Sequence, residues 1–218
     1  MRDAIGLLLG YAIGSVLPAY LIGRAYGVDL RAFGDGNLGA TNARDRFGSR
    51  VGRLVAALDM LKGPLAVLLA GSLGAGSWAT YGAGIAAIAG HRYPFYLKFR
   101  GGRGFATAAG LLASGLIWAV WQGWLPPLDG LLLIGVFTVL WLVYRDRGVP
   151  NTVVLPLAYA DIALRQPPTS FAACLGVVAL AVWLFNLRRV RAEDLFRHPA
   201  LFQAPGRSPD TPPGPGGV

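Results

Sequence analysis

The feature that most constrains this chain is the series of long apolar runs that fill most of its 218 residues. The runs lie at about 4–23, 54–73, 78–90, 104–122, 129–144, 149–164 and 170–187. A helix that crosses a bilayer needs about 20 apolar residues, with a range of roughly 17–25. The sequence therefore predicts an all-α, polytopic transmembrane helical bundle of about seven spans. The third and sixth runs are short by this rule, so each is either a half-helix or extends into its flanks.

The composition agrees with a membrane protein. Hydrophobic residues make up 54% of the chain and charged residues only 14%, whereas soluble chains have about 25% charged residues. The net charge of +9 also raises nucleic acid as a partner, but most basic residues lie in loops beside apolar runs, where they suit anionic lipid headgroups. We therefore expect the lipid bilayer as a partner and no nucleic acid. The single cysteine, Cys174, excludes an internal disulfide.

The basic residues also predict the orientation of the chain. If all seven runs cross the membrane, nearly all of the 20 Lys and Arg residues fall in loops on one side. Only Arg2 and Arg165 fall on the other side, and Lys62 lies within a run. The positive-inside rule then places the N-terminus outside and the C-terminus in the cytoplasm. Residues 203–218 are rich in Pro and Gly and are expected to form a disordered tail after a membrane domain of residues 1–202.

The first basic loop combines glycines, amides and arginines. It reads Gly34-Asp-Gly-Asn-Leu-Gly-Ala-Thr-Asn-Ala-Arg-Asp-Arg-Phe-Gly48. Glycines let peptide N–H groups turn inward together, and arginine carries a charge that does not titrate away. Such a loop can bind a phosphate. The candidate substrate-binding residues are Gly36, Asn37, Gly39, Thr41, Asn42 and Arg44. An ordinary polar loop with helix caps is the alternative interpretation.

A second basic loop has similar chemistry. It contains Gly101, Gly102, Arg103 and Gly104, directly before an apolar run. A glycine turn that leads into a helix N-terminus presents unpaired N–H donors and the positive end of the helix dipole, which suits a phosphate. The spacing is not that of a Walker loop, and a basic interfacial loop is the alternative. Two such loops on the same membrane face together favour a shared anion site.

Three ionisable residues lie within or beside the apolar runs. Asp59 and Lys62 are three residues apart, so a helix places them on nearly the same face. Such residues face either each other, as a structural pair, or a polar cavity. His91 follows the third run and is a candidate general base, or else an interfacial histidine that holds one hydrogen bond. No cluster of His, Cys and carboxylates has metal-ligand spacing, so no metal or other cofactor is expected.

Several of these motifs, in this order, resemble the bacterial membrane acyl-phosphate:glycerol-3-phosphate acyltransferases. The likeness covers about residues 14–113 and is carried by Gly14-Ser-Val-Leu-Pro-Ala-Tyr-Leu-Ile-Gly-Arg24, Asp29-Leu-Arg31, Gly36-Asn-Leu-Gly-Ala-Thr-Asn-Ala-Arg44, Asp59-Met-Leu-Lys-Gly63, Gly90-His91 and Gly101-Gly-Arg-Gly104 with Ala106-Thr107. The resemblance implies a multi-pass enzyme of the bacterial inner membrane, with its active site facing the cytoplasm. A soluble enzyme that makes acyl-phosphate is then an expected partner.

The resemblance also implies the reaction. A fatty acyl group passes from acyl-phosphate to glycerol-3-phosphate, which gives lysophosphatidic acid and inorganic phosphate for phospholipid biosynthesis. Phosphate is a good leaving group, so positioning and charge neutralisation can supply most of the catalysis. In this interpretation Arg44 and Arg103 bind phosphate groups, and His91 together with Arg44 supports catalysis.

The chain departs from the family pattern at several positions. Asp35 stands where the family usually has Ser, and Arg103 stands where it has Lys. In the last run Asn186 matches the third family motif as a substrate-binding candidate, but Trp183 occupies the position of a His. These departures favour, as an alternative, a diverged paralogue that binds a phosphorylated lipid precursor without turnover or uses another acceptor. The Asp59–Lys62 pair leaves a small organic-anion transporter as a further alternative.

Overall fold

The computed structural model describes residues 1–144, 148–165 and 167–189, so the predicted tail lies outside the described residues. The helices are α1 (Arg2–Ser15), α2 (Pro18–Ala25), α3 (Ala40–Phe47), α4 (Ser49–Ser72), α5 (Ser77–Arg92), α6 (Phe105–Trp121), α7 (Pro127–Tyr144), α8 (Gly148–Leu164) and α9 (Thr169–Arg189), with short 3-10 turns η1 (Leu30–Ala32) and η2 (Phe95–Leu97). Each predicted apolar run falls on a helix, and the first falls on two. The predicted all-α architecture is confirmed.

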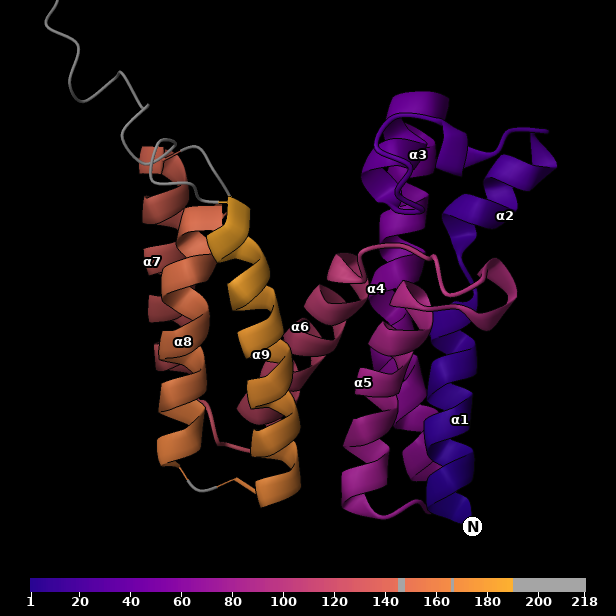
Figure 1. The fold of residues 1–218 in the computed structure, drawn as a ribbon. Helices are drawn as coiled ribbons and strands as arrows, with labels where there is room; N and C mark the ends of the chain where they lie inside the picture. Colours follow the sequence, from indigo (N-terminus) through magenta and orange to yellow (C-terminus); the bar gives the residue numbers. More distant parts are fainter. Residues whose placement is uncertain (145–147, 166, 190–218) are drawn as a thin grey trace, which may run out of the picture.

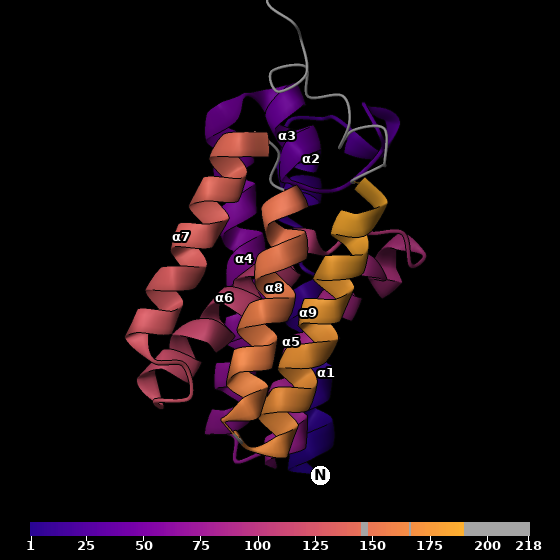
Figure 2. The same cartoon turned by 90° about the vertical axis from the view of Figure 1, so that its left-hand side faces the viewer.

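The long helices form two groups that α6 connects (Figure 1). Helices α1, α4 and α5 pack together in one group, and α7, α8 and α9 form the other. Helix α6 is inclined between them, and α9 contacts both α5 and α6. After a turn of 90°, α7, α8 and α9 stand in front of the first group (Figure 2). Helices α2 and α3 lie at one end of the molecule, and the N-terminus lies at the other.

The first apolar run does not form one straight helix, as a single span over 4–23 requires. Helix α1 ends at Ser15 and α2 begins at Pro18, and the two helices are bent by 42°. Leu17, between them, is extended with φ −100° and ψ 102°. The residue before a proline is pushed out of the helical region by the proline ring. Pro18 therefore ends the first helix and redirects the chain.

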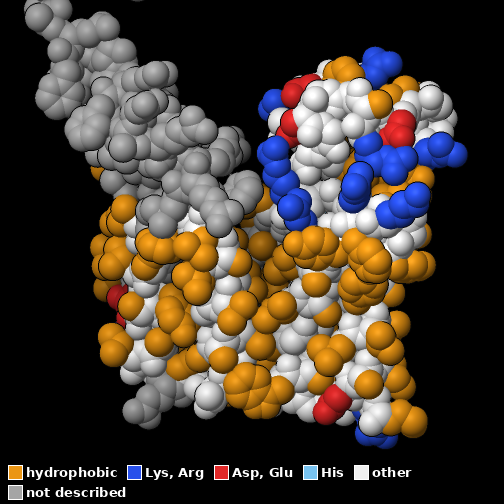
Figure 3. Space-filling view, viewed as in Figure 1, with side chains coloured by type: hydrophobic (Ala, Val, Ile, Leu, Met, Phe, Trp, Pro, Cys, Tyr) orange, Lys and Arg blue, Asp and Glu red, His pale blue; other side chains and the backbone are white. Residues whose placement is uncertain are grey.

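The outside of the helices is apolar. Leu68, Ile117 and Leu131 are exposed by 69%, 71% and 65%. Apolar side chains form a broad band over the long helices, whereas Lys and Arg side chains gather at the end that carries α2 and α3 (Figure 3). An apolar surface of this extent is typical of a protein in contact with lipid. The basic end is the one that the predicted orientation places in the cytoplasm.

Within the described residues, only α4 is long and apolar enough to cross a bilayer by itself. Helices α1 and α2 meet the same criterion together, as a bent pair. Helix α5 has 16 residues, which corresponds to a length of about 24 Å, less than the roughly 30 Å of the hydrocarbon core. The seven crossings and their orientation stay predictions.

Small residues bring α1 and α5 into close contact. A side chain at Gly10 would overlap the carbonyl oxygen of Ala83, and one at Gly14 would overlap that of Ala87. Spaced small residues of this kind let membrane helices approach closely enough for their backbones to touch. The contact brings the end of α1 beside the end of α5, where His91 lies.

Candidate functional site

One buried amide organises the first glycine loop. Asn42, in the first turn of α3, is only 3% exposed. Its Nδ2 group lies 3.0 Å from three backbone carbonyl oxygens, those of Leu30, Phe33 and Asn37, and donates to them. The loop is thereby folded around the start of α3. This arrangement supports a scaffolding role for Asn42, whereas substrate binding by this residue stays a prediction.

Backbone conformation and lack of space favour glycine at several positions of the first loop. Gly34 and Gly36 have φ values of +57° and +68°, which are unfavourable for other residues. An added side chain at Gly34 would overlap Oδ1 of Asn42. Gly39 is the N-cap residue of α3, with the exposed Thr41 two residues further on. A short backbone turn places the N–H of Asn37 3.1 Å from Oδ1 of Asp35, which accepts it.

The second glycine loop folds back on the end of α5. The N–H groups of Gly101 and Gly102 donate to the carbonyl oxygens of Arg92 and His91, each at 3.0 Å. A side chain at Gly102 would overlap Nε2 of His91 and would approach the carbonyl oxygen of Leu38. Gly102 is therefore enclosed between His91 and the first loop. The two loops predicted to form a shared anion site do lie side by side.

An ion pair joins the two loops at the surface. Nη2 of Arg103 donates to Oδ2 of Asp35 at 2.7 Å. The two side chains are about half exposed. Asp35 and Arg103 are also the two positions at which the loops differ from the family pattern. The two unusual residues therefore contact each other. Arg44 forms a different ion pair, with its neighbour Asp45 at 2.9 Å.

Gly104 completes the second loop and is the N-cap residue of α6, with a φ of +77°. The helix begins at Phe105, immediately after the loop that carries Arg103. The positive end of the α6 dipole thus lies at the loop. Thr107, in the same turn, is fully buried, and its hydroxyl group has no hydrogen-bond partner. Thr107 belongs to the stretch that carries the family resemblance, but the sequence had indicated no role for it.

Beneath the glycine loops lies a buried cluster of Asp59, Lys62 and His91. None of the three residues is more than 5% exposed. Nζ of Lys62 lies 2.7 Å from Oδ1 of Asp59 and 3.2 Å from Nδ1 of His91. Nδ1 of His91 lies 3.5 Å from the same carboxylate oxygen of Asp59. The pairing neutralises the two opposite charges of Asp59 and Lys62, as a buried location requires.

The cluster also connects α4 to its neighbours. Nζ of Lys62 donates to the carbonyl oxygen of Gly14 in α1 at 3.4 Å. Because Asp59 and Lys62 are paired and covered by protein, they support the structural interpretation rather than the one of a transport pathway. His91 is equally covered, and its Nε2 faces Gly102. The histidine is therefore placed to support the second loop from below.

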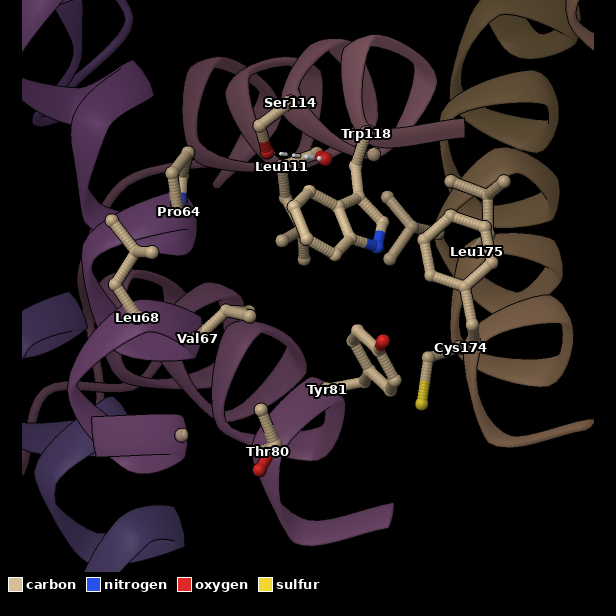
Figure 4. Close-up of a pocket in the computed structure, with 14 residues that line it drawn as sticks. Pro64, Val67, Leu68, Thr80, Tyr81, Leu111, Ser114, Trp118, Cys174 and Leu175 are labelled. Carbon is tan, nitrogen blue, oxygen red and sulfur yellow. Dashed lines mark hydrogen bonds between the residues drawn. The ribbon is translucent and has the colours of Figure 1, made fainter. Parts of the chain in front are cut away.

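A largely apolar cavity of about 440 Å³ lies between α4, α5, α6 and α9. Its lining starts at Pro64, two residues after Lys62, and includes Tyr81, Trp118, Cys174 and Leu175. Figure 4 shows these side chains around a common opening. The hydrogen bond drawn there is donated by the hydroxyl group of Ser114 to the carbonyl oxygen of Leu111, at 2.9 Å. The cavity lies deeper than the glycine loops, and no sequence motif had indicated it.

The third family motif lies on α9. Trp183 is partly buried in that helix, and Asn186 follows it within the same helix, although its side chain lies outside the described residues.

Within the described residues, no group of three or more His, Cys, Asp and Glu side chains has an arrangement that would hold a metal ion.

Comparison with known proteins places this chain in a family. A sequence profile described as Glycerol-3-phosphate acyltransferase matches residues 4–193. A glycerol-3-phosphate acyltransferase of Thermus thermophilus is 44% identical over 188 residues, which cover 85% of this chain and 89% of that protein. One of Rubrobacter xylanophilus is 43% identical over 162 residues, which cover 73% of this chain and 76% of that protein.

The fold is also similar to a solved structure. The crystal structure of PlsY (YgiH), an integral membrane glycerol 3-phosphate acyltransferase, in its glycerol 3-phosphate form superposes with a TM-score of 0.65 at 29% identity. The match covers 87% of this chain and 90% of that one. The lysophosphatidic acid form of the same protein gives a TM-score of 0.64 at 28% identity, with coverage of 87% and 89%.

The apolar exterior and the likeness to PlsY define an integral membrane protein with an all-helical fold. The profile match and the relatives add the chemical class, an acyltransferase. The chain belongs to the glycerol-3-phosphate acyltransferase family and is an enzyme of that family. This result confirms the resemblance that the glycine loops and the Asp59–Lys62 segment had indicated.

Proposed function

We propose that this enzyme transfers a fatty acyl group from acyl-phosphate to glycerol-3-phosphate, forming lysophosphatidic acid and inorganic phosphate. The observation that carries the proposal is the junction of the two glycine loops above the buried Asp59–Lys62–His91 cluster and near an apolar cavity. Two anionic substrates require cationic groups, and a fatty chain requires an apolar site. Arg103 lies directly before α6, and α6 lines the apolar cavity.

The proposed step is a substitution at the acyl carbon. A hydroxyl oxygen of glycerol-3-phosphate forms a bond to that carbon, and the bond from the carbon to the phosphate oxygen breaks. The phosphate leaves with the bonding electrons and can take up the hydroxyl proton. Arg44 and Arg103 would neutralise the phosphate groups. The protein thereby contributes orientation and charge stabilisation.

We propose a positioning role for His91, because its side chain is 2% exposed. Nδ1 is held by the Asp59–Lys62 pair, and Nε2 faces the backbone of Gly102. A base that takes a proton from the substrate must come within hydrogen-bond reach of it. In this structure Gly102 occupies that space. A change at His91 would therefore affect the reaction by shifting the second glycine loop.

The apolar cavity is our candidate site for the fatty chain. It begins next to the polar cluster on α4 and continues along that helix away from the basic end. A ligand tail that enters it exchanges lipid or water for apolar side chains. The basic end would face the cytoplasm of a bacterial cell, where a soluble enzyme could deliver acyl-phosphate. The membrane domain would comprise residues 1–202, with residues 203–218 as a tail.

Substitution of the two arginines tests the phosphate-binding assignment. Arg44→Ala and Arg103→Ala should each raise the KM for a phosphorylated substrate about 10- to 100-fold, since a hydrogen bond to a charged group contributes roughly 1.5–3 kcal/mol. Arg50→Ala is a matched control, because Arg50 is exposed in the first turn of α4, just after α3. The assignment is wrong if KM and turnover of the two site variants equal those of the control.

A further inference from the structure

Arg103 already has an anionic partner within the protein. Its Nη2 donates to Oδ2 of Asp35 at 2.7 Å, across the boundary between the two glycine loops. The other oxygen of that carboxylate accepts the backbone N–H of Asn37 at 3.1 Å. Asp35 is therefore held by its own loop while it binds the arginine of the other loop. Its carboxylate occupies a position on Arg103 that a phosphate oxygen would need.

The ion pair is easily opened. Arg103 is 51% exposed and Asp35 47% exposed, so water competes for both groups. Exposed ion pairs of this kind are weak because solvent and salt screen them. A phosphate group carries up to two negative charges and can receive two parallel hydrogen bonds from a guanidinium group. A phosphorylated ligand can therefore displace the carboxylate.

We infer that Asp35 is an internal counter-ion that holds Arg103 between the two loops and yields it to the phosphate group of a ligand. This inference rests on the proposed function for the phosphate-binding role of Arg103. The ligand class is a phosphate monoester, an acyl-phosphate or inorganic phosphate. Asp35 thereby lowers the affinity for phosphate and re-forms its bond to Arg103 when phosphate leaves.

The test is the affinity of purified full-length protein in detergent for inorganic phosphate and for glycerol-3-phosphate, measured by calorimetry. Asp35→Asn removes the charge but keeps an oxygen that can accept the N–H of Asn37. We expect it to bind phosphate about threefold to fivefold more tightly, the factor by which an exposed ion pair shifts an equilibrium. In an Arg103→Ala background the same substitution should have no effect.

Asp29→Asn is the matched control. Asp29 pairs with Arg31 at 2.7 Å, and its side chain is similarly exposed, at 40%. The hydrogen bonds from Arg31 lower the pKa of Asp29 to about 2, so the substitution removes a full charge at neutral pH. The control should leave phosphate affinity unchanged, because the Asp29–Arg31 pair does not involve Arg103.

Three results would overturn the inference. Asp35→Asn could weaken or not change phosphate binding, it could tighten binding equally in the Arg103→Ala background, or the control could tighten binding as much. The binding measurement needs no turnover, so it is separate from the proposed function. Tighter binding by Asp35→Asn in a protein that makes no lysophosphatidic acid would support the counter-ion and reject the reaction. Formation of lysophosphatidic acid together with an unchanged phosphate affinity of Asp35→Asn would support the reaction and reject the counter-ion.

Discussion

Asp59 and Lys62 depend on each other because both side chains are removed from solvent. Removal of one member of a buried ion pair leaves an uncompensated charge, which costs roughly 3–5 kcal/mol of stability. We therefore expect Asp59→Asn to lower the midpoint of thermal unfolding in detergent strongly. The double variant Asp59→Asn/Lys62→Met should recover most of the loss, since it removes both charges.

An exposed pair provides the control for that prediction. Asp45 pairs with Arg44 at 2.9 Å with both side chains about half exposed. Asp45→Asn should change the stability by less than about 1 kcal/mol. Equal unfolding midpoints for Asp59→Asn and Asp45→Asn would mean that the buried pair does not stabilise the fold.

His91 gives a second prediction at the residue scale. A positioning role predicts that His91→Ala raises the KM for the phosphorylated substrate, because the second glycine loop loses its support. His91→Asn, which retains a hydrogen-bonding side chain, should restore part of the effect. A general base instead contributes about 10²- to 10⁴-fold to turnover. A loss of that size in kcat, with KM unchanged in both variants, would contradict the positioning role.

At the scale of elements, the packing of α4, α5, α6 and α9 forms the cavity assigned to the fatty chain. Cys174 lines it and is the only cysteine of the chain. Lysophosphatidic acid should therefore slow the reaction of Cys174 with an apolar maleimide severalfold, whereas glycerol-3-phosphate should not. The reaction is followed by mass spectrometry of the native protein in detergent.

The control for this labelling is the double variant Cys174→Ala/Leu131→Cys. Leu131 is 65% exposed on α7, outside this cavity. Its modification should proceed at the same rate with and without lysophosphatidic acid. Protection at both positions would indicate a general effect of added lipid on the detergent micelle. No protection at Cys174 would argue against the cavity as the acyl site.

The elements themselves could largely be predicted from the sequence. A membrane helix requires a long apolar run, so the runs coincide with the helices. The break in the first run follows from Pro18, whose ring excludes a helical conformation for Leu17. The close approach of α1 to α5 is less evident from the sequence. It depends on Gly10 and Gly14 lying opposite Ala83 and Ala87, and only the packed structure shows which helices face each other.

At the scale of the whole molecule, contacts between distant segments limited what the sequence could predict. The motifs indicated two anion-binding loops, and these loops do meet. Asp35 and Arg103 are 68 positions apart, so their ion pair depends on how the loops fold onto α5. Asn42 was predicted from its residue type as a substrate ligand, yet its amide is occupied by three carbonyl groups of its own loop. The cavity is formed by side chains of four helices, and no sequence motif marks those side chains.

At this scale we propose that the whole membrane protein catalyses acyl transfer from acyl-phosphate to glycerol-3-phosphate. The most direct measurement is phosphate release by the purified protein in detergent, given acyl-phosphate with and without glycerol-3-phosphate, with lysophosphatidic acid assayed in parallel. We expect phosphate release that depends on the acceptor and equals the lysophosphatidic acid formed. Phosphate release without the acceptor, or no lysophosphatidic acid from a folded protein that still binds the acceptor, would contradict this function.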